Sequence, residues 1–109
     1  MIYIGNAFSL SMLDPSRDEY GLYVTRLTAE DVIDLLENNV FESVVGHQST
    51  ADVLTQLLGI DIEMNRKMLE LTRGDTLIVF QLMTRLPEGK ILSQEELENL
   101  DYTFYLVEI

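Results

Sequence analysis

The sequence predicts a single α/β domain over residues 1–109, built on a mixed, mainly parallel β-sheet of about five strands that is flanked by helices. Apolar runs rich in branched and aromatic residues alternate along the chain with segments that carry helix-capping patterns. Hydrophobic residues make up 47% of the chain, which is enough for a packed core at this length. Neither a repeat nor a linker divides the chain.

The predicted strands share a high content of Ile, Val, Phe, Tyr and Leu between turn residues. They are the runs 2–4, 22–26, 41–45, 76–83 and 102–107, with a further candidate at 68–71. The run 76–83 is nearly all apolar, which is typical of a central strand covered on both faces.

Three helices are predicted from capping patterns, in which a hydroxyl residue is followed three residues later by an acidic one. These patterns begin at Thr28, Ser49 and Ser93, and Gly59 ends the second helix. A helical turn is predicted over 7–13, and turns are predicted at 73–74 and 86–89.

The charge of the chain excludes one large class of partners. The formal net charge is −12 and only seven residues are Lys or Arg. Proteins that bind an extended DNA or RNA duplex neutralise many phosphates from a basic surface, so we expect no such partner. A small anion held by two or three of these cations is compatible with the composition.

The absence of cysteine and the presence of a single histidine limit the catalytic and metal sites that the chain can form. The chain has no cysteine and one histidine, so a thiol nucleophile is excluded and a zinc site would need carboxylates for its other protein ligands. We therefore expect no metal and no cofactor. Since no apolar run approaches the roughly 18 residues of a membrane span and no signal-peptide pattern begins the chain, we expect a cytoplasmic protein without a membrane partner.

The histidine, His47, stands where an apolar run gives way through Gly46 to a predicted helix. Polar residues also follow the predicted strands 2–4 and 76–83, and ligands of parallel α/β sheets collect at the carboxyl ends of strands. The candidates at these ends are Asn6, Ser9, His47, Ser49, Thr50, Arg85 and Glu88. A helix N-terminus and an arginine both suit phosphate, so the pattern predicts a small phosphate-bearing ligand with His47 handling the proton.

Each candidate also has a purely structural interpretation. Ser49 is a helix cap in its own right, and His47 is an ordinary polar residue for a turn. Arg85 suits a solvated strand end, and Glu88 suits a turn. Their shared location, rather than any one residue, favours a site.

Four segments of the chain carry a resemblance to a known family. They are NAFSLSML (6–13), GHQST (46–50), NRKMLEL (65–71) and RLPEGKILS (85–93). In this order and spacing they resemble the ring nucleases of viruses and mobile elements, which antagonise type III CRISPR by degrading cyclic tetra-adenylate. The resemblance covers nearly the whole chain and is loosest over 14–40. It implies a mixed sheet with helices, assembled as a homodimer that encloses the ring on its two-fold axis.

The resemblance also assigns roles to residues. It implies His47, Arg85 and Glu88 as catalytic residues. It implies Asn6, Ser9, Ser11, Ser49, Thr50 and Arg66 as substrate-binding residues. Ser11 stands where many relatives have an asparagine, so its assignment rests on position alone, and Pro87 replaces a commonly acidic residue.

Together, the residues and the resemblance predict a metal-independent phosphodiesterase. The ribose 2′-hydroxyl attacks the neighbouring phosphorus and leaves a 2′,3′-cyclic phosphate, while His47 protonates the departing oxygen. Arg85 neutralises the phosphate, and Glu88 either orients His47 or contacts the ribose. Two other functions stay open: a non-catalytic sponge that only sequesters the ring, and an acidic inhibitor that binds a protein partner.

Overall fold

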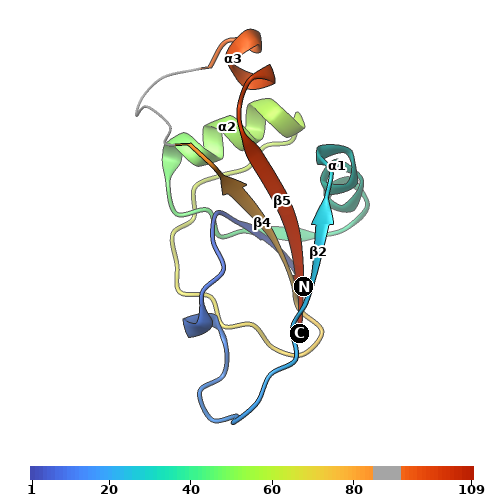
Figure 1. The fold of residues 1–109 in the computed structure, drawn as a ribbon, viewed down its shortest axis with the longest axis vertical. Helices are drawn as coiled ribbons and strands as arrows, with labels where there is room; N and C mark the ends of the chain where they lie inside the picture. The colour runs from blue at the N-terminus through green and yellow to red at the C-terminus, as the bar shows by residue number, and fades with distance from the viewer. Residues whose placement is uncertain (85–91) are drawn as a thin grey trace.

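Residues 1–84 and 92–109 are described in a computed structural model of the chain (Figure 1). The five strands of the sheet are β1 (Ile2–Gly5), β2 (Tyr23–Leu27), β3 (Phe41–Ser43), β4 (Thr76–Leu82) and β5 (Tyr102–Glu108). The helices are the 3-10 helix η1 (Leu10–Met12), α1 (Ala29–Asn38), α2 (Gln48–Leu58) and α3 (Gln94–Glu98). No helix within these two ranges is long and apolar enough to cross a membrane.

The strand order β2-β5-β4-β1-β3 confirms a mixed sheet of five strands, with two parallel and two antiparallel pairings. β1 lies between β4 and β3 and is parallel to both, with Ile4 opposite Ile78 on one side and Ser43 on the other. β5 is antiparallel to both β4 and β2, so the other four strands run in one direction. The carboxyl ends of β1, β3 and β4 therefore lie at one edge of the sheet, on the left in Figure 1.

One face of the sheet carries the main core beneath the helices. Val32 of α1 and Leu54 of α2 are fully buried there, in one cluster with Ile4, Phe80 and Phe104 of the sheet. The Phe80 and Phe104 ring centroids are 5.1 Å apart, a favourable spacing for aromatic pairs. This packing places the N-terminus of α2 at the carboxyl edge of the sheet, that is, the edge where the carboxyl ends of β1, β3 and β4 lie.

The opposite face is covered by chain segments that are not α-helices. Leu69 and Leu71 pack there against Leu77 and Val79, together with Phe8 and Met12 from the segment around η1. The predicted strand at 68–71 is wrong. Leu69 and Leu71 alternate with exposed neighbours as in a strand, but they cover a face of the sheet instead of pairing at its edge.

Local capping signals explain where α1 and α3 begin. Thr28 and Ser93 form the predicted capping boxes with Asp31 and Glu96. Gly59 ends α2 in the left-handed conformation, with φ of 67°, which favours glycine. These three predictions are confirmed.

Candidate active site at the carboxyl edge of the sheet

Asn6 joins the ends of two parallel strands. It directly follows β1, and its Oδ1 accepts a hydrogen bond of 3.0 Å from the backbone N–H of Gly46, in the turn between β3 and α2. The two residues are 40 positions apart in sequence. The parallel pairing of β1 with β3 brings them together, so the turn that carries His47 is held by the end of the neighbouring strand.

Arg66 packs on the same turn. A side-chain carbon added at Gly46 would lie 3.7 Å from Cγ of Arg66 and 3.8 Å from Oδ1 of Asn6, so the stem of Arg66 passes over the glycine. Two ion pairs occur within the described part of the chain, namely the N-terminal ammonium with Asp75 and Lys67 with Glu42. Arg66 has no carboxylate partner among these residues, which leaves its guanidinium available to an anion.

His47 is the N-cap residue of α2. Its backbone is extended, with φ of −133° and ψ of 133°, and its exposed side chain makes no capping hydrogen bond to the first turn. The N-terminus of α2 therefore has no side-chain cap from the residue that occupies the cap position. Free N–H groups and the positive end of the helix dipole commonly bind phosphate at helix N-termini.

The prediction that Ser49 caps this helix is wrong. α2 begins at Gln48, one residue before Ser49, because the chain turns at Gly46 and becomes helical directly after His47. Asp52, the expected partner of Ser49, instead accepts a hydrogen bond of 2.8 Å from Nε2 of Gln48. Ser49 is half-buried and Thr50 is buried in the first turn of α2.

The two serines of the first motif lie apart from this group. Ser9 caps η1 by accepting a hydrogen bond from the Ser11 backbone, and the two hydroxyls are 3.0 Å apart. Both residues are exposed, and η1 (dark blue) lies lower in Figure 1 than α2. Within the described ranges, neither serine is hydrogen-bonded to Asn6, His47 or Arg66.

The structure thus brings together Asn6, His47, Ser49, Thr50 and Arg66 at one edge. Arg85 and Glu88 lie outside the described residues. β4 ends at Leu82, on the same edge as β1.

Ser43 and Asn65 support this edge of the sheet, although no sequence pattern predicted a role for either. Ser43 is buried at the end of β3, and its hydroxyl donates to the Glu63 carbonyl at 2.6 Å. Asn65 donates from Nδ2 to the Ser43 carbonyl at 2.8 Å. No sequence signal identifies these bonds, because each partner lies about twenty residues away.

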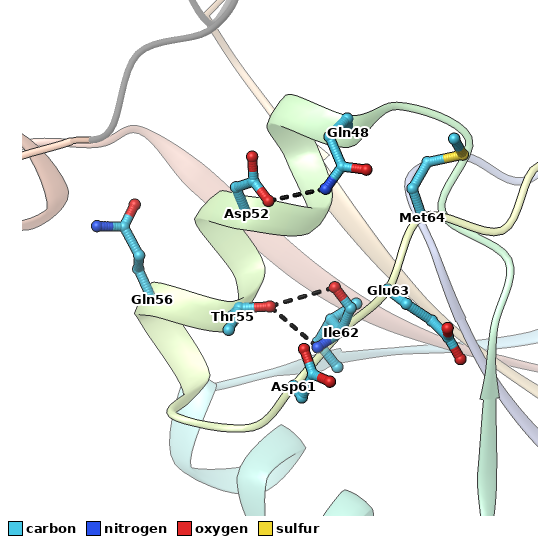
Figure 2. Close-up of a pocket in the computed structure, with 8 residues that line it drawn as sticks. All are labelled: Gln48, Asp52, Thr55, Gln56, Asp61, Ile62, Glu63 and Met64. Atoms are coloured by element: carbon cyan, nitrogen blue, oxygen red, sulfur yellow. Dashed lines mark hydrogen bonds between the residues drawn. The ribbon is translucent and has the colours of Figure 1, made fainter.

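A separate pocket opens beside α2, with a volume of about 540 Å³. Figure 2 shows its lining: Gln48, Asp52, Thr55, Gln56, Asp61, Ile62, Glu63 and Met64. Among the described residues, three carboxylates and no cation line this pocket, so the charge of these residues is unsuited to a phosphate. In residues 1–84 and 92–109, no three His, Cys, Asp or Glu side chains are grouped so that they could hold a metal ion.

This edge of the sheet offers a cation, backbone N–H donors and an imidazole. Arg66 packs against Gly46, and His47 is exposed at the N-cap of α2, where the first N–H groups of the helix are free. The Oδ1 atom of Asn6 is already hydrogen-bonded to the Gly46 N–H, so Asn6 holds the end of β1 to the chain before α2.

Comparison with known proteins identifies the family of this fold. The STIV B116-like family model matches residues 2–104. The chain is 43% identical over 110 residues to "Uncharacterized protein 26" of Sulfolobus islandicus filamentous virus, covering all of this chain and 92% of the relative. It is 45% identical over 67 residues to YddF of Bacillus subtilis, covering 62% of each chain. The solved structure of B116 of Sulfolobus turreted icosahedral virus matches with a TM-score of 0.87 at 28% identity, covering 99% of this chain and 98% of that one. The chain therefore belongs to the STIV B116-like family.

Proposed function

We propose that this protein is a metal-independent ring nuclease that binds cyclic tetra-adenylate, cleaves it to linear products and so antagonises type III CRISPR signalling. The observation that carries the proposal is the meeting of His47, Arg66 and the uncapped N-terminus of α2 at one edge. These residues belong to two of the four segments that resemble ring nucleases. Viral relatives agree with an anti-CRISPR role.

The ligand class follows from the balance of charges. A chain of net charge −12 repels a long polyanion, yet the edge offers Arg66 and a helix N-terminus to a phosphate or two. In a homodimer with a symmetric ring on its two-fold axis, each protomer would contribute one Arg66 and one helix N-terminus, so the ring would contact two of each. A small cyclic oligonucleotide therefore fits the available cations better than a duplex does.

In the proposed reaction the substrate supplies its own nucleophile. The ribose 2′-oxygen forms a bond to the adjacent phosphorus, the bond from phosphorus to the 5′-oxygen breaks, and the 2′-hydroxyl proton passes to water. His47 gives its proton to the departing 5′-oxygen. Arg66 and the first-turn N–H groups of α2 hold the phosphate so that attack is in line, and the resemblance adds Arg85 as a second cation.

The test is incubation of the purified protein with cyclic tetra-adenylate, followed by chromatography and mass spectrometry of the products. Linear products that first carry a 2′,3′-cyclic phosphate are expected. A ring with hydrogen in place of every 2′-hydroxyl should bind without being cut. Cleavage of that deoxy ring, or a phosphorylated serine on the enzyme, would overturn the mechanism.

The same assay separates the proposal from its main alternative. A sponge would bind the ring and return it intact, so binding without any linear product refutes catalysis. A protein that does not bind the ring at all refutes both functions.

A further inference from the structure

Residues 62–66 form a segment that lies beside residues 43–45, at the end of β3. Met64 makes a parallel bridge with Val45, and the N–H of Asn65 donates to the Val45 carbonyl at 2.8 Å. Val45 immediately precedes the turn at Gly46 and His47. The segment therefore runs beside the chain that leads into the proposed site, and Arg66 is its last residue.

The Asn65 side chain adds a second link between this segment and the end of β3. Its Nδ2 donates to the Ser43 carbonyl at 2.8 Å, while the buried Ser43 hydroxyl donates to the Glu63 carbonyl and accepts from the Val45 N–H. Ser43 is only 5% exposed, so water competes little for these bonds. The end of β3 and the segment are thus joined by side chains from both sides.

Thr55 ties the segment to α2 as well. Its hydroxyl accepts from the Ile62 N–H at 2.9 Å and lies 3.2 Å from the Ile62 carbonyl (Figure 2). The same hydroxyl lies 3.0 Å from the Ala51 carbonyl within α2. The helix that begins at His47 is therefore attached to the same segment that ends at Arg66. Residues 43–47, α2 and 62–66 form one connected unit.

We propose that Asn65 is a positioning residue, which sets the place of Arg66 relative to His47. The inference rests on the proposed function, in which Arg66 holds the phosphate that His47 helps to cleave. Without the Nδ2 bond, the backbone hydrogen bond from Asn65 to Val45 still joins the segment to the chain after β3, but the Ser43 carbonyl loses the Asn65 side chain as its partner. The distance between the Arg66 guanidinium and the His47 imidazole then varies more. Catalysis is sensitive to a misplacement of reacting groups by about an ångström.

The experiment compares Asn65→Ala with Asn39→Ala. Asn39 is a matched control, because its Nδ2 also donates to a backbone carbonyl, that of Leu35 at 2.9 Å, at the end of α1. Amide hydrogen exchange is measured on the free protein, and single-turnover cleavage is measured with the enzyme in saturating excess over cyclic tetra-adenylate. Should Asn65→Ala fail to fold, Asn65→Ser replaces it, since a serine hydroxyl is too short to reach the Ser43 carbonyl.

We expect Asn65→Ala to speed exchange of the Val45 and Gly46 amides, with β5 amides unchanged. The cleavage rate should fall about tenfold to a hundredfold, and ring affinity should fall by less. Asn39→Ala should leave both the exchange of the turn and the rate at wild-type values.

Three results would overturn the inference. One is unchanged exchange at Val45 and Gly46 in Asn65→Ala. Another is an equal loss of rate in Asn39→Ala, which would show that global stability is responsible. The third is wild-type cleavage despite faster exchange at the turn. A wild-type protein that does not cut the ring refutes the proposed function itself, and the exchange data then still decide whether Asn65 holds the turn.

Discussion

Replacement of His47 by alanine should separate catalysis from stability. The side chain is exposed and makes no capping bond to α2, so its loss should change the free energy of unfolding by less than about 0.5 kcal/mol. In a chain of this size that corresponds to a shift in Tm of no more than about 4 °C. Loss of a general acid lowers the rate by about a hundredfold or more, and a hundredfold corresponds to about 2.7 kcal/mol in the barrier.

The assay is single-turnover cleavage with enzyme in excess, with ring binding and thermal unfolding measured on the same samples. Gln48→Ala serves as the control, since Gln48 is the exposed neighbour and its bond to Asp52 faces the acidic pocket. We expect H47A to bind the ring, to unfold within about 4 °C of the wild-type Tm and to cleave at about 1% of the wild-type rate or less. Near wild-type cleavage by H47A would refute the role of His47 as general acid. If H47A is slow but also loses about 2.7 kcal/mol of unfolding free energy, the conclusion that the His47 side chain does not stabilise the fold is refuted.

Three further predictions concern metal independence, assembly and stability in acid. Cleavage should survive excess EDTA, because the proposed reaction uses only His47, arginine and the substrate hydroxyl; a requirement for added magnesium or manganese would contradict it. Light scattering of the free protein should give about twice the 12.5 kDa chain mass, and a chain that stays monomeric with ring bound would contradict a shared site. Partial burial raises the pKa of Asp75, but hydrogen bonds from Thr72 and the N-terminal ammonium outweigh burial, so this pKa lies below its ordinary value of 3.8. Asp75 thus stabilises the fold above about pH 4 and loses this effect as the pH falls through the lowered pKa. Urea unfolding of Asp75→Asn should show a smaller loss of stability between neutral and acid pH than the wild type, and an unchanged loss would refute this.

The sequence predicted those features that depend on neighbouring residues. The capping boxes at Thr28 and Ser93 join groups three residues apart, so the pattern itself contains both partners. The run 76–83 became the central strand β4, because only a position covered on both faces accepts so many apolar side chains in succession. The alternation of strands and helices predicted a mixed α/β sheet, because parallel neighbours such as β1 and β3 require a crossover connection.

The tertiary structure decided which groups meet at the site. Ser49 matched a capping pattern, yet the turn at Gly46 starts α2 one residue earlier and makes His47 the N-cap. Leu69 and Leu71 alternate as in a strand but are buried on a face of the sheet. In the sequence, Asn6 and Asn65 resemble ordinary polar loop residues. The pairing of β1 with β3 brings Asn6 to the Gly46 N–H. The segment 62–66, which lies beside the end of β3, brings Asn65 to the Ser43 carbonyl. Sequence patterns report bonds within a few residues, whereas these partners lie 22 to 40 residues apart and are chosen by how the strands pair.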